Sequence, residues 1–354
     1  MRYLIWLLLI LLVLFRQITN RPKYSDGDRV RITTRVTNEP IKYEYSQRLI
    51  LSGLKVYLPR FPEISYGDKV VVEGTILSRE LKNPVLVFQD EGTGLLFKFR
   101  KKLIDFYRKS LPEPHASLVA GVTLGSKQSI PSDFWEALKT TGTAHVVVAS
   151  GMNVTLVAGF LVNFLIIFMT RRKAVPLALV GIWIYALVSG FDAPIVRAAI
   201  MGSIGFAGIA LGRVNNAWRG LFLSALGMLI VKTEWLVDLG FILSFVATAS
   251  LMLFEKKIEK KLNFIPKVIR ADFATSLAAQ IGVAPILWIT FGQFNLLSPM
   301  INALVLWTIA PITMIGMISG FVGIFVPLIG RMILFVIYPL TSWFIVIVNY
   351  FAAI

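Results

Sequence analysis

The sequence predicts a polytopic α-helical membrane protein with an N-terminal, extracytoplasmic, small β-barrel domain. Hydrophobic residues occupy 56% of the 354 positions and charged residues only 16%, whereas soluble domains carry about a quarter charged residues. Long apolar segments fill the chain after residue 145, but residues 24–98 contain only short apolar runs. The formal net charge of +16 suits the topology of a membrane protein and also suits an anionic ligand.

The composition limits the chemistry that the chain can perform. The sequence contains no cysteine, which excludes disulfides, thiolate catalysis and cysteine-ligated metal sites. His115 and His145 are its two histidines, so one chain cannot supply a three-histidine metal site. We therefore expect no metal and no other cofactor. No Gly-rich phosphate-binding loop ending in lysine occurs, so an ATP-driven motor would be a separate protein.

Residues 1–20 are predicted to form a membrane anchor helix. The segment 3–15 is apolar, and basic residues flank it at Arg2 and Arg16. It is short for a membrane span, which needs about 20 residues. A signal peptide is the alternative, although no small-residue cleavage site follows the segment.

Residues 21–98 are predicted to form the small β-barrel. Turn signals at 25–28, 66–69, 82–84 and 90–94 separate short runs of alternating apolar residues, as in small all-β domains. The phrase from Gly67 to Gly74 resembles the start of a strand in oligonucleotide-binding (OB) barrels, so we expect an OB-like domain. The alternating residues are Val30, Ile32 and Thr34; Leu49, Leu51 and Val56; Val70, Val72 and Ile76; and Val85, Val87 and Phe97.

Basic residues on these predicted strands form a candidate external DNA-binding face. Phosphate contacts dominate the affinity of proteins for nucleic acids, and they require lysine and arginine. The alternative is an ordinary solvated barrel surface, and both interpretations remain open for each residue. The candidates are Arg29, Arg31, Arg35, Arg48 and Lys55.

Residues 99–145 are predicted to form amphipathic and interfacial helices. The segment 96–111 has one apolar face and a basic remainder, which favours a helix lying in the membrane surface. Single-strand nucleic-acid binding is the alternative for this segment. Two short helical pieces follow within 113–144, the first opened by Pro114 and the second with Ser132 as its N-cap.

Residues 146–354 are predicted to form the transmembrane domain. Loops rich in lysine and arginine, at 171–173, 213–219 and 255–270, alternate with loops poor in basic charge, at 190–193, 232–238 and 292–298. The positive-inside rule places the basic loops in the cytoplasm, so residues 21–145 would lie outside. The eight predicted spans are 146–169, 174–189, 194–211, 220–232, 236–254, 272–291, 299–325 and 331–353.

Polar residues mark the start of the first of these spans. His145, Ser150 and Asn153 interrupt an otherwise apolar segment, and positions 145, 149 and 153 share one face of a continuous helix. Polar side chains within a span face a partner or water. They would either line a passage or form hydrogen bonds to neighbouring helices, and the spacing leaves both open.

Several motifs occur in a fixed order along the chain. They are Gly121-Val-Thr-Leu-Gly125; residues 134–140; Gly142-Thr-Ala-His145 with Ala149-Ser-Gly-Met-Asn-Val154; Pro194-Ile-Val-Arg-Ala198; Leu239-Gly-Phe-Ile-Leu-Ser-Phe245; Ala279-Gln280 with Pro285; and Phe291-Gly-Gln-Phe294 with Leu297-Ser-Pro299 and Asn302. This series resembles the signature of the ComEC-type competence channel family, and the resemblance covers roughly residues 24–325.

The resemblance implies a non-enzymatic channel that passes single-stranded DNA into the cytoplasm during natural transformation. It implies a multi-pass protein of the bacterial cytoplasmic (inner) membrane, in contact with lipid, that works with a separate DNA receptor, nuclease and ATP-driven motor. Many members continue into a metallo-β-lactamase-like nuclease domain, which this sequence lacks. The family usually has a second histidine where this chain has Asn153, which cannot titrate near neutral pH, so we expect no protonation role there.

Six residues are candidates for lining the channel or contacting DNA: Arg197, His145, Ser150, Asn153, Gln280 and Asn302. Arg197 is favoured because a guanidinium binds phosphate bidentately, and its alternative is an ion pair with Asp192 or Asp238. Gln280 and Asn302 would otherwise form hydrogen bonds between helices. Two other functions stay open: a small-solute transporter with broken helices, and a membrane-embedded enzyme that uses His145.

Overall fold

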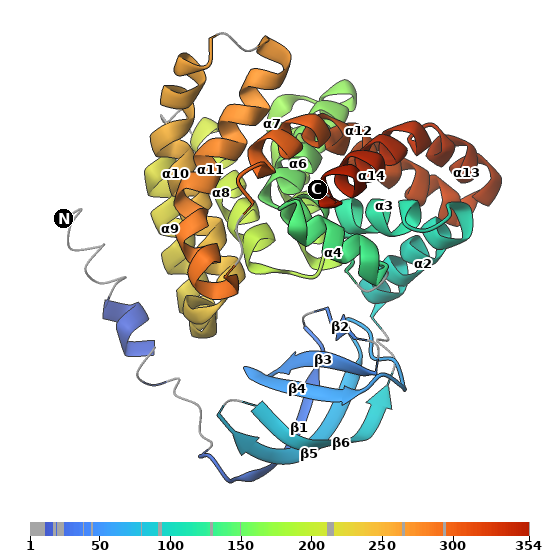
Figure 1. Ribbon diagram of the computed structural model, residues 1–354, viewed down its shortest axis with the longest axis vertical. Coiled ribbons are helices and arrows are strands. Elements are labelled where there is room, and N and C mark those ends of the chain that lie inside the picture. Colours follow the sequence, from blue (N-terminus) through green and yellow to red (C-terminus); the bar gives the residue numbers. More distant parts are fainter. Residues whose placement is uncertain are drawn as a thin grey trace.

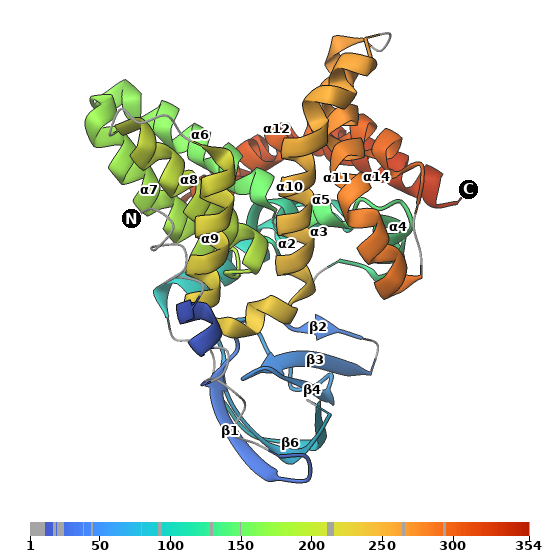
Figure 2. The ribbon, with the colours of Figure 1, turned by 90° about the vertical axis from the view of Figure 1, so that its left-hand side faces the viewer.

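The fold consists of a β-sheet at one end of a larger body of helices (Figure 1). The computed structural model describes residues 11–353, apart from 17, 18, 20–24, 38, 44, 79, 91–93, 128, 129, 149, 211–215, 264, 265, 293 and 294. A view at right angles shows the same separation, with β2 and β3 nearest the helices and β1 and β6 farther away (Figure 2).

The sheet has six strands in the order β1-β5-β6-β4-β3-β2. Its neighbours pair antiparallel, except for β4 and β6, which are parallel. The sheet is strongly curved, but β1 and β2 remain as its edges, so pairing among the described residues does not close it into a barrel (Figure 2). The strands are β1 (Arg29–Arg35), β2 (Ile41–Lys42), β3 (Ser46–Leu51), β4 (Leu54–Pro59), β5 (Lys69–Leu77) and β6 (Glu80–Asp90).

The predicted alternation of apolar residues is confirmed in this sheet. Successive side chains of a strand point to opposite faces, and the predicted residues of β1, β3, β4 and β5 are buried, apart from the half-buried Val30 and Thr34. Three details are wrong. The predicted Val85 and Val87 lie on β6 but are 61% and 47% exposed, so they do not belong to the core. Lys82-Asn-Pro84 is not a turn but lies within β6, where the register with β5 shifts and Asn83 adopts a φ of 48°, as in a bulge. Phe97 belongs to a helix, and its ring packs edge-on to Tyr66 with the ring centroids 5.1 Å apart.

Helices lie at each of the eight predicted spans, but fewer than eight of the described helices are long and apolar enough to cross a membrane. Four candidate spans are long and apolar enough to cross a membrane: Ala144–Phe168, Leu239–Lys261, Arg270–Thr290 and Ser298–Phe325. A bent helix pair would make a fifth, so the described helices fit a multi-pass membrane protein. The helices are α2 (Leu95–Ser110), α3 (His115–Leu124), α4 (Ser132–Thr140), α5 (Ala144–Val147), α6 (Gly151–Phe168), α7 (Arg171–Val188), α8 (Ala193–Ala210), α9 (Ala217–Val231), the 3-10 helix η1 (Thr233–Val237), α10 (Leu239–Lys261), α11 (Lys267–Phe291), α12 (Ser298–Phe325), α13 (Pro327–Phe335) and α14 (Tyr338–Ala352).

Two predicted helix features differ from the structure. The last predicted span, 331–353, is broken between α13 and α14, which meet at an angle of 50°. Pro339 explains the break, because its missing N–H cannot continue the hydrogen-bond ladder of α13. Ser132 is not an N-cap: Pro131 takes that position, and the Ser132 hydroxyl donates a hydrogen bond to Asp133.

The described part of the predicted anchor packs on the helical body. Residues 11–16 are helical, and Val13 lies in a buried cluster with Val196 and Met228. Arg16 donates a hydrogen bond to the carbonyl of Ile230 in α9. Residues 1–10 of the predicted anchor lie outside the described residues.

The apolar face of α2 is covered by protein, and not by lipid as its amphipathic pattern suggested. Leu103, Phe106 and Tyr107 lie in one buried cluster with residues of α3 and α12. Tyr107 is fully buried, and its hydroxyl donates to the carbonyl of Gly316 in α12 at 2.9 Å. Glycines on α12 let the neighbouring helices approach it closely. A Cβ on Gly316, for example, would lie 2.9 Å from Thr123 of α3.

Two weakly charged loops and one basic loop lie at opposite ends of the molecule. The loop before α8 lies at the sheet end, where Tyr66 and Lys127 contact it. Glu234 of η1 lies against Gly53 in the β3–β4 turn, so this loop is also at the sheet end. The basic connection between α10 and α11 lies at the opposite end, as both views show (Figure 2). This separation agrees with the predicted alternation of basic and weakly charged loops.

Removing the buried Tyr107 side chain should destabilise the protein. Tyr107→Ala should lower the free energy of unfolding in detergent micelles by about 3–5 kcal/mol, because it leaves a cavity between α2 and α12. Tyr107→Phe should cost only about 1 kcal/mol, for the lost hydrogen bond. Tyr57→Phe on the exposed face of β4 is the control and should have no effect. Equal losses from both Tyr→Phe variants would contradict this packing.

Candidate nucleic-acid site at a broken helix

The helix predicted to begin the transmembrane domain is broken. α5 ends at Val147, Val148 and Ser150 have extended backbone, and α6 begins at Gly151 with Ser150 as its N-cap. Serine is favoured at an N-cap because its hydroxyl oxygen can accept from an N–H of the first turn, but Ser150 makes no such bond here. His145 and Asn153 therefore do not lie on one continuous helix, and position 149 of the predicted stripe lies outside the described residues.

The break separates the polar residues that the stripe would have joined. His145 is exposed, and its Nδ1 lies 2.9 Å from the carbonyl oxygen of Gly142. Asn153 is fully buried and donates from Nδ2 to the carbonyl of Val122 in α3 at 2.9 Å, so it joins two helices. Within the described residues, the buried Ser150 Oγ and Asn153 Oδ1 have no hydrogen-bond partner.

Arg197 of α8 lies beside α10 without an ion pair. Its Nε donates to Ser244 Oγ at 2.7 Å, and its guanidinium lies over the Phe245 ring, 5.9 Å from the centroid. Neither predicted ion pair forms: Asp192 pairs with Lys127, and Asp238 caps α10 by accepting from the Phe241 N–H at 2.8 Å. In the part of the chain that the structure describes, no carboxylate lies within 4 Å of Arg197.

The guanidinium of Arg197 also lies against the first turn of α6. A Cβ on Gly151 would sit 2.7 Å from Arg197 Nη2, so a larger residue there would displace the guanidinium. The first N–H groups of a helix have no partner within the helix, and the helix dipole makes this end positive. A cation beside this positive helix end is electrostatically unfavourable. A bound anion would neutralise the cation and would also accept hydrogen bonds from the unpaired N–H groups. Arg197, Ser150 and Gly151 therefore form an arrangement suited to a phosphate group.

Gln280 and Asn302 form hydrogen bonds within the α11–α12 region. Gln280 Nε2 donates to the carbonyl of Asn295 at 2.8 Å. Asn302 Nδ2 donates to Ser276 Oγ at 2.8 Å, which ties α12 to α11. The Asn302 bond matches the interhelical alternative, whereas the Gln280 bond ties α11 to the loop that precedes α12. Their side-chain carbonyl oxygens are buried and have no partner among the described residues.

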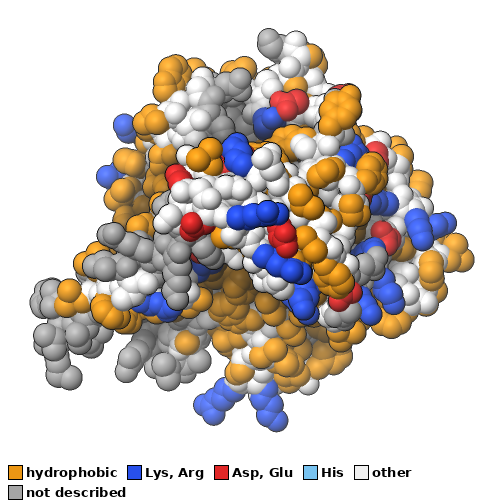
Figure 3. All heavy atoms as spheres, turned by 90° about the horizontal axis from the view of Figure 1, so that it is seen from below, with side chains coloured by type: hydrophobic (Ala, Val, Ile, Leu, Met, Phe, Trp, Pro, Cys, Tyr) orange, Lys and Arg blue, Asp and Glu red, His pale blue; other side chains and the backbone are white. Residues whose placement is uncertain are grey.

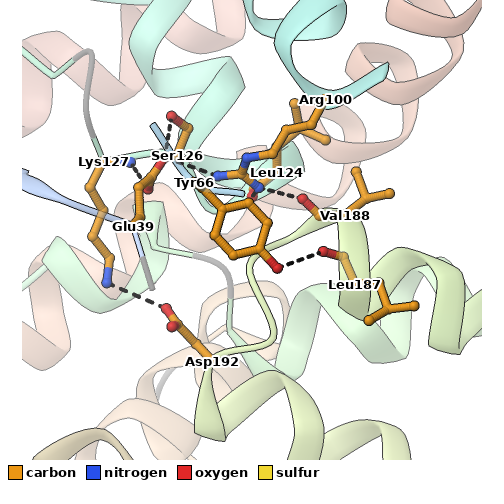
Figure 4. Close-up of polar contacts among 9 residues, drawn as sticks. All are labelled: Glu39, Tyr66, Arg100, Leu124, Ser126, Lys127, Leu187, Val188 and Asp192. Carbon is orange, nitrogen blue, oxygen red and sulfur yellow. Dashed lines mark hydrogen bonds and ion pairs between the residues drawn. The ribbon is translucent and has the colours of Figure 1, made fainter. Parts of the chain in front are cut away.

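A buried ion pair that the sequence analysis missed joins the sheet to the helices (Figure 4). Arg100 of α2 and Glu39, which follows β1, meet at 3.0 Å with side chains only 5% and 8% exposed. Arg100 also donates to the carbonyls of Leu124 and Val188, at the C-terminal ends of α3 and α7. The Glu39 carboxylate accepts from the Ser126 hydroxyl at 2.9 Å and from the Lys127 N–H at 2.6 Å.

Tyr66 and Asp192 extend this junction toward α8. The Arg100 guanidinium lies over the Tyr66 ring, and the Tyr66 hydroxyl donates to the Leu187 carbonyl at 3.2 Å (Figure 4). Burial raises the pKa of this hydroxyl, against a smaller lowering effect of Arg100, so Tyr66 remains a neutral donor. Lys127 pairs with Asp192 at 3.5 Å, five residues before Arg197.

One signal in the sequence could have identified Arg100. It is the basic residue of the 96–111 segment that shares a helical face with Leu103 and Tyr107, at spacings of three and seven. A charge on an apolar face must be paired when that face is buried.

The predicted external basic residues divide into two groups on the sheet. On β1, Arg29 and Arg31 lie 4.0 and 3.6 Å from Glu73 of β5, so their charge is partly neutralised, and Arg35 continues the same outward row. On β3 and β4, Arg48 and Lys55 point outward and have no described carboxylate within 4 Å.

Exposed aromatic rings accompany this second group. Tyr57 is the register partner of Arg48, and Tyr45 and Phe61 are strongly exposed at the same end of the hairpin. Arg60 lies over the Phe61 ring. Seen from the sheet end, basic, acidic and hydrophobic side chains all reach the molecular surface (Figure 3). On β3, β4 and the residues next to them, basic and aromatic side chains interleave. Such interleaving suits a strand with charged phosphates and flat bases.

A family model described as "Competence protein" matches residues 122–354, about two thirds of the chain. The chain belongs to the competence protein family. The matched region begins within α3 and includes the α5–α6 break, Arg197 and the α11–α12 contacts.

Two relatives of this competence-family chain give similar alignments. The ComE operon protein 3 of Bacillus subtilis (strain 168) is 29% identical over 211 residues, which cover 59% of this chain and 26% of that protein. The competence protein ComA of Neisseria gonorrhoeae is 26% identical over 223 residues, covering 58% of this chain and 30% of that protein. The chain thus spans less than a third of the length of either relative. No solved structure matches it.

The buried ion pair should be essential to stability. Arg100→Gln should lower the free energy of unfolding by about 3–5 kcal/mol, because it leaves the Glu39 carboxylate buried without its cation. The double variant Glu39→Gln/Arg100→Gln should be more stable than Arg100→Gln alone. Lys127→Gln, which breaks the more exposed pair with Asp192, is the control and should cost about 0–1 kcal/mol. Chemical unfolding in detergent measures all three, and additive losses in the double variant would contradict the pairing.

Proposed function

We propose that this competence-family chain is a channel that passes single-stranded DNA through the bacterial cytoplasmic membrane during natural transformation. Family membership and the set of long apolar helices support a membrane-embedded role in DNA uptake. The sheet and the basic α10–α11 connection lie at opposite ends (Figure 2). This supports placing residues 21–145 outside the cytoplasm, on the side where DNA arrives.

The observation that carries this proposal is the arrangement around Arg197. Its guanidinium donates to the Ser244 hydroxyl oxygen, has no described carboxylate within 4 Å, and lies beside the positive end of α6. A phosphate of a passing strand would accept from the guanidinium and from the N–H groups of the first turn of α6. Ser150 would add a hydroxyl at the same point. His145, Gln280 and Asn302 make no described contact with Arg197, so we assign the principal phosphate contact to Arg197.

We propose that the curved sheet is an OB-like receiving domain. The β3–β4 face supports this role, because Arg48, Lys55 and Tyr57 point outward together. Bases stack on exposed aromatic rings with little regard to sequence, while basic side chains follow the phosphates. This face lies on the half of the sheet nearer the helices, so a bound strand would have a short route to the α5–α6 break (Figure 2).

The remaining steps of uptake are assigned to other proteins. A DNA receptor, a nuclease that supplies the single strand and an ATP-driven motor are proposed as separate partners. The sequence supports the assignment of the motor, because it carries no phosphate-binding loop of the ATPase type.

Arg197 should be required for uptake but not for folding. Arg197→Ala should reduce transformation frequency by at least about 100-fold while the protein still reaches the membrane, because the loss of a charge-assisted phosphate contact costs about 3 kcal/mol. Arg197→Lys should retain part of the activity, since it keeps the charge but loses the bidentate geometry. Arg219→Ala, an exposed arginine of α9, is the control. Normal uptake by Arg197→Ala would overturn the assignment.

The two groups of basic residues on the sheet should differ in DNA binding. Arg48→Ala with Lys55→Ala should weaken binding of labelled single-stranded DNA to the full chain and reduce the slope of its salt dependence by about one to two. Arg29→Ala with Arg31→Ala removes the same charge but should have a smaller effect, because Glu73 already neutralises part of it. A larger loss of binding in the Arg29/Arg31 variant would place the bound DNA strand on β1 instead.

A further inference from the structure

The outward face of α2 carries a stripe of exposed basic side chains. Lys98, Lys101, Lys102, Arg108 and Lys109 are all exposed, and their spacing of three, four or seven places them on one side of the helix. Asp105, half-buried on the same side, leaves the stripe a net charge of +4, from five basic residues and one acid. The opposite face is the buried one, with Leu103, Phe106 and Tyr107.

Exposed apolar side chains border one end of this stripe. Arg331 of α13 donates to the carbonyl of Lys109 at 3.4 Å, so α13 lies beside the C-terminal end of α2 (Figure 1). The outward residues of α13 are unusually open: Leu328 is 71% exposed, Met332 67% and Phe335 63%. In a chain with several membrane spans, such apolar side chains are covered by the hydrocarbon of the bilayer. The basic stripe therefore begins where the apolar surface ends.

We propose that the α2 stripe binds the headgroups of anionic phospholipids, whose acyl chains lie against α13. An anionic lipid supplies a phosphate and an apolar chain in one molecule, which matches a basic stripe that borders an apolar surface. A nucleic acid would supply the phosphates but would also have to cover, or stop short of, the apolar surface of α13. This inference does not depend on the proposed passage of DNA.

The absence of cysteine from the sequence permits a direct test on the full chain. Met332→Cys places a single site for a bimane fluorophore on the exposed face of α13. In mixed micelles, brominated phosphatidylglycerol should quench this fluorophore at several-fold lower concentration than brominated phosphatidylcholine. The stripe variant Lys98→Gln/Lys101→Gln/Lys102→Gln/Lys109→Gln should remove most of this preference, at roughly fivefold per charge for those charges that face a headgroup.

Two matched variants separate the charge of the stripe from general effects. The corresponding four Lys→Arg substitutions keep the charge and should keep the preference. Lys256→Gln/Lys257→Gln/Lys260→Gln/Lys261→Gln removes four exposed charges from the far end of α10 and should leave quenching at Met332→Cys unchanged.

Three results would overturn the proposal. Equal quenching by the two lipids in the Met332→Cys chain would exclude a headgroup preference. A preference that survives in the Lys→Gln stripe variant would place the headgroup elsewhere. Competition by single-stranded DNA oligonucleotides, lost in the stripe variant, would assign the stripe to nucleic acid. Transformation frequency is not a readout here, so failure of this proposal and failure of the DNA channel would be told apart.

Discussion

The attachment of the sheet to the helices depends on the ion pair between Glu39 and Arg100. Burying two charges costs several kcal/mol per ion unless their other donors and acceptors are satisfied. Here they are: Arg100 binds the carbonyl ends of α3 and α7, where the helix dipoles favour a cation, and Glu39 binds a hydroxyl and a backbone N–H. A pair satisfied in this way fixes geometry, since any other placement of the sheet would leave charges buried and unpaired.

The same junction connects to both sides of the candidate site. α3, whose C-terminal end Arg100 binds, holds Asn153 in the first turns of α6 through the carbonyl of Val122. α7, whose end Arg100 also binds, leads through the loop with Asp192 into α8 and Arg197. The Arg100 guanidinium thus contacts the end of α3, which bonds α6, and the end of α7, which leads into α8.

The sequence predicted this architecture better than it predicted the site. Periodicity identified the strands and the spans, because apolar side chains must alternate in a strand and cover a helix in a membrane. Periodicity failed where a single residue interrupts an otherwise regular apolar segment. Ser150 ends one helix and begins another inside an apolar run, and Pro339 divides the last span. Arg197 was a candidate from the sequence, but its contacts were not predicted, since Ser244 and Gly151 lie far from it in the chain and contacts at such separation leave no local pattern. Arg100 was missed because five other basic residues lie in the same segment, so its place on the apolar face did not stand out.

The positive character of the α5–α6 break also bears on the permeability of the membrane. A passage that follows this break would present a guanidinium and a helix N-terminus, with no described carboxylate within 4 Å of that guanidinium. Fixed positive charge repels sodium ions, potassium ions and hydronium, as an arginine does at the constriction of a selective pore. Such a conduit could stay permissive to a polyanion while resisting leakage of the cations that energise the membrane. Electrical insulation and DNA passage would then rest on the same side chain.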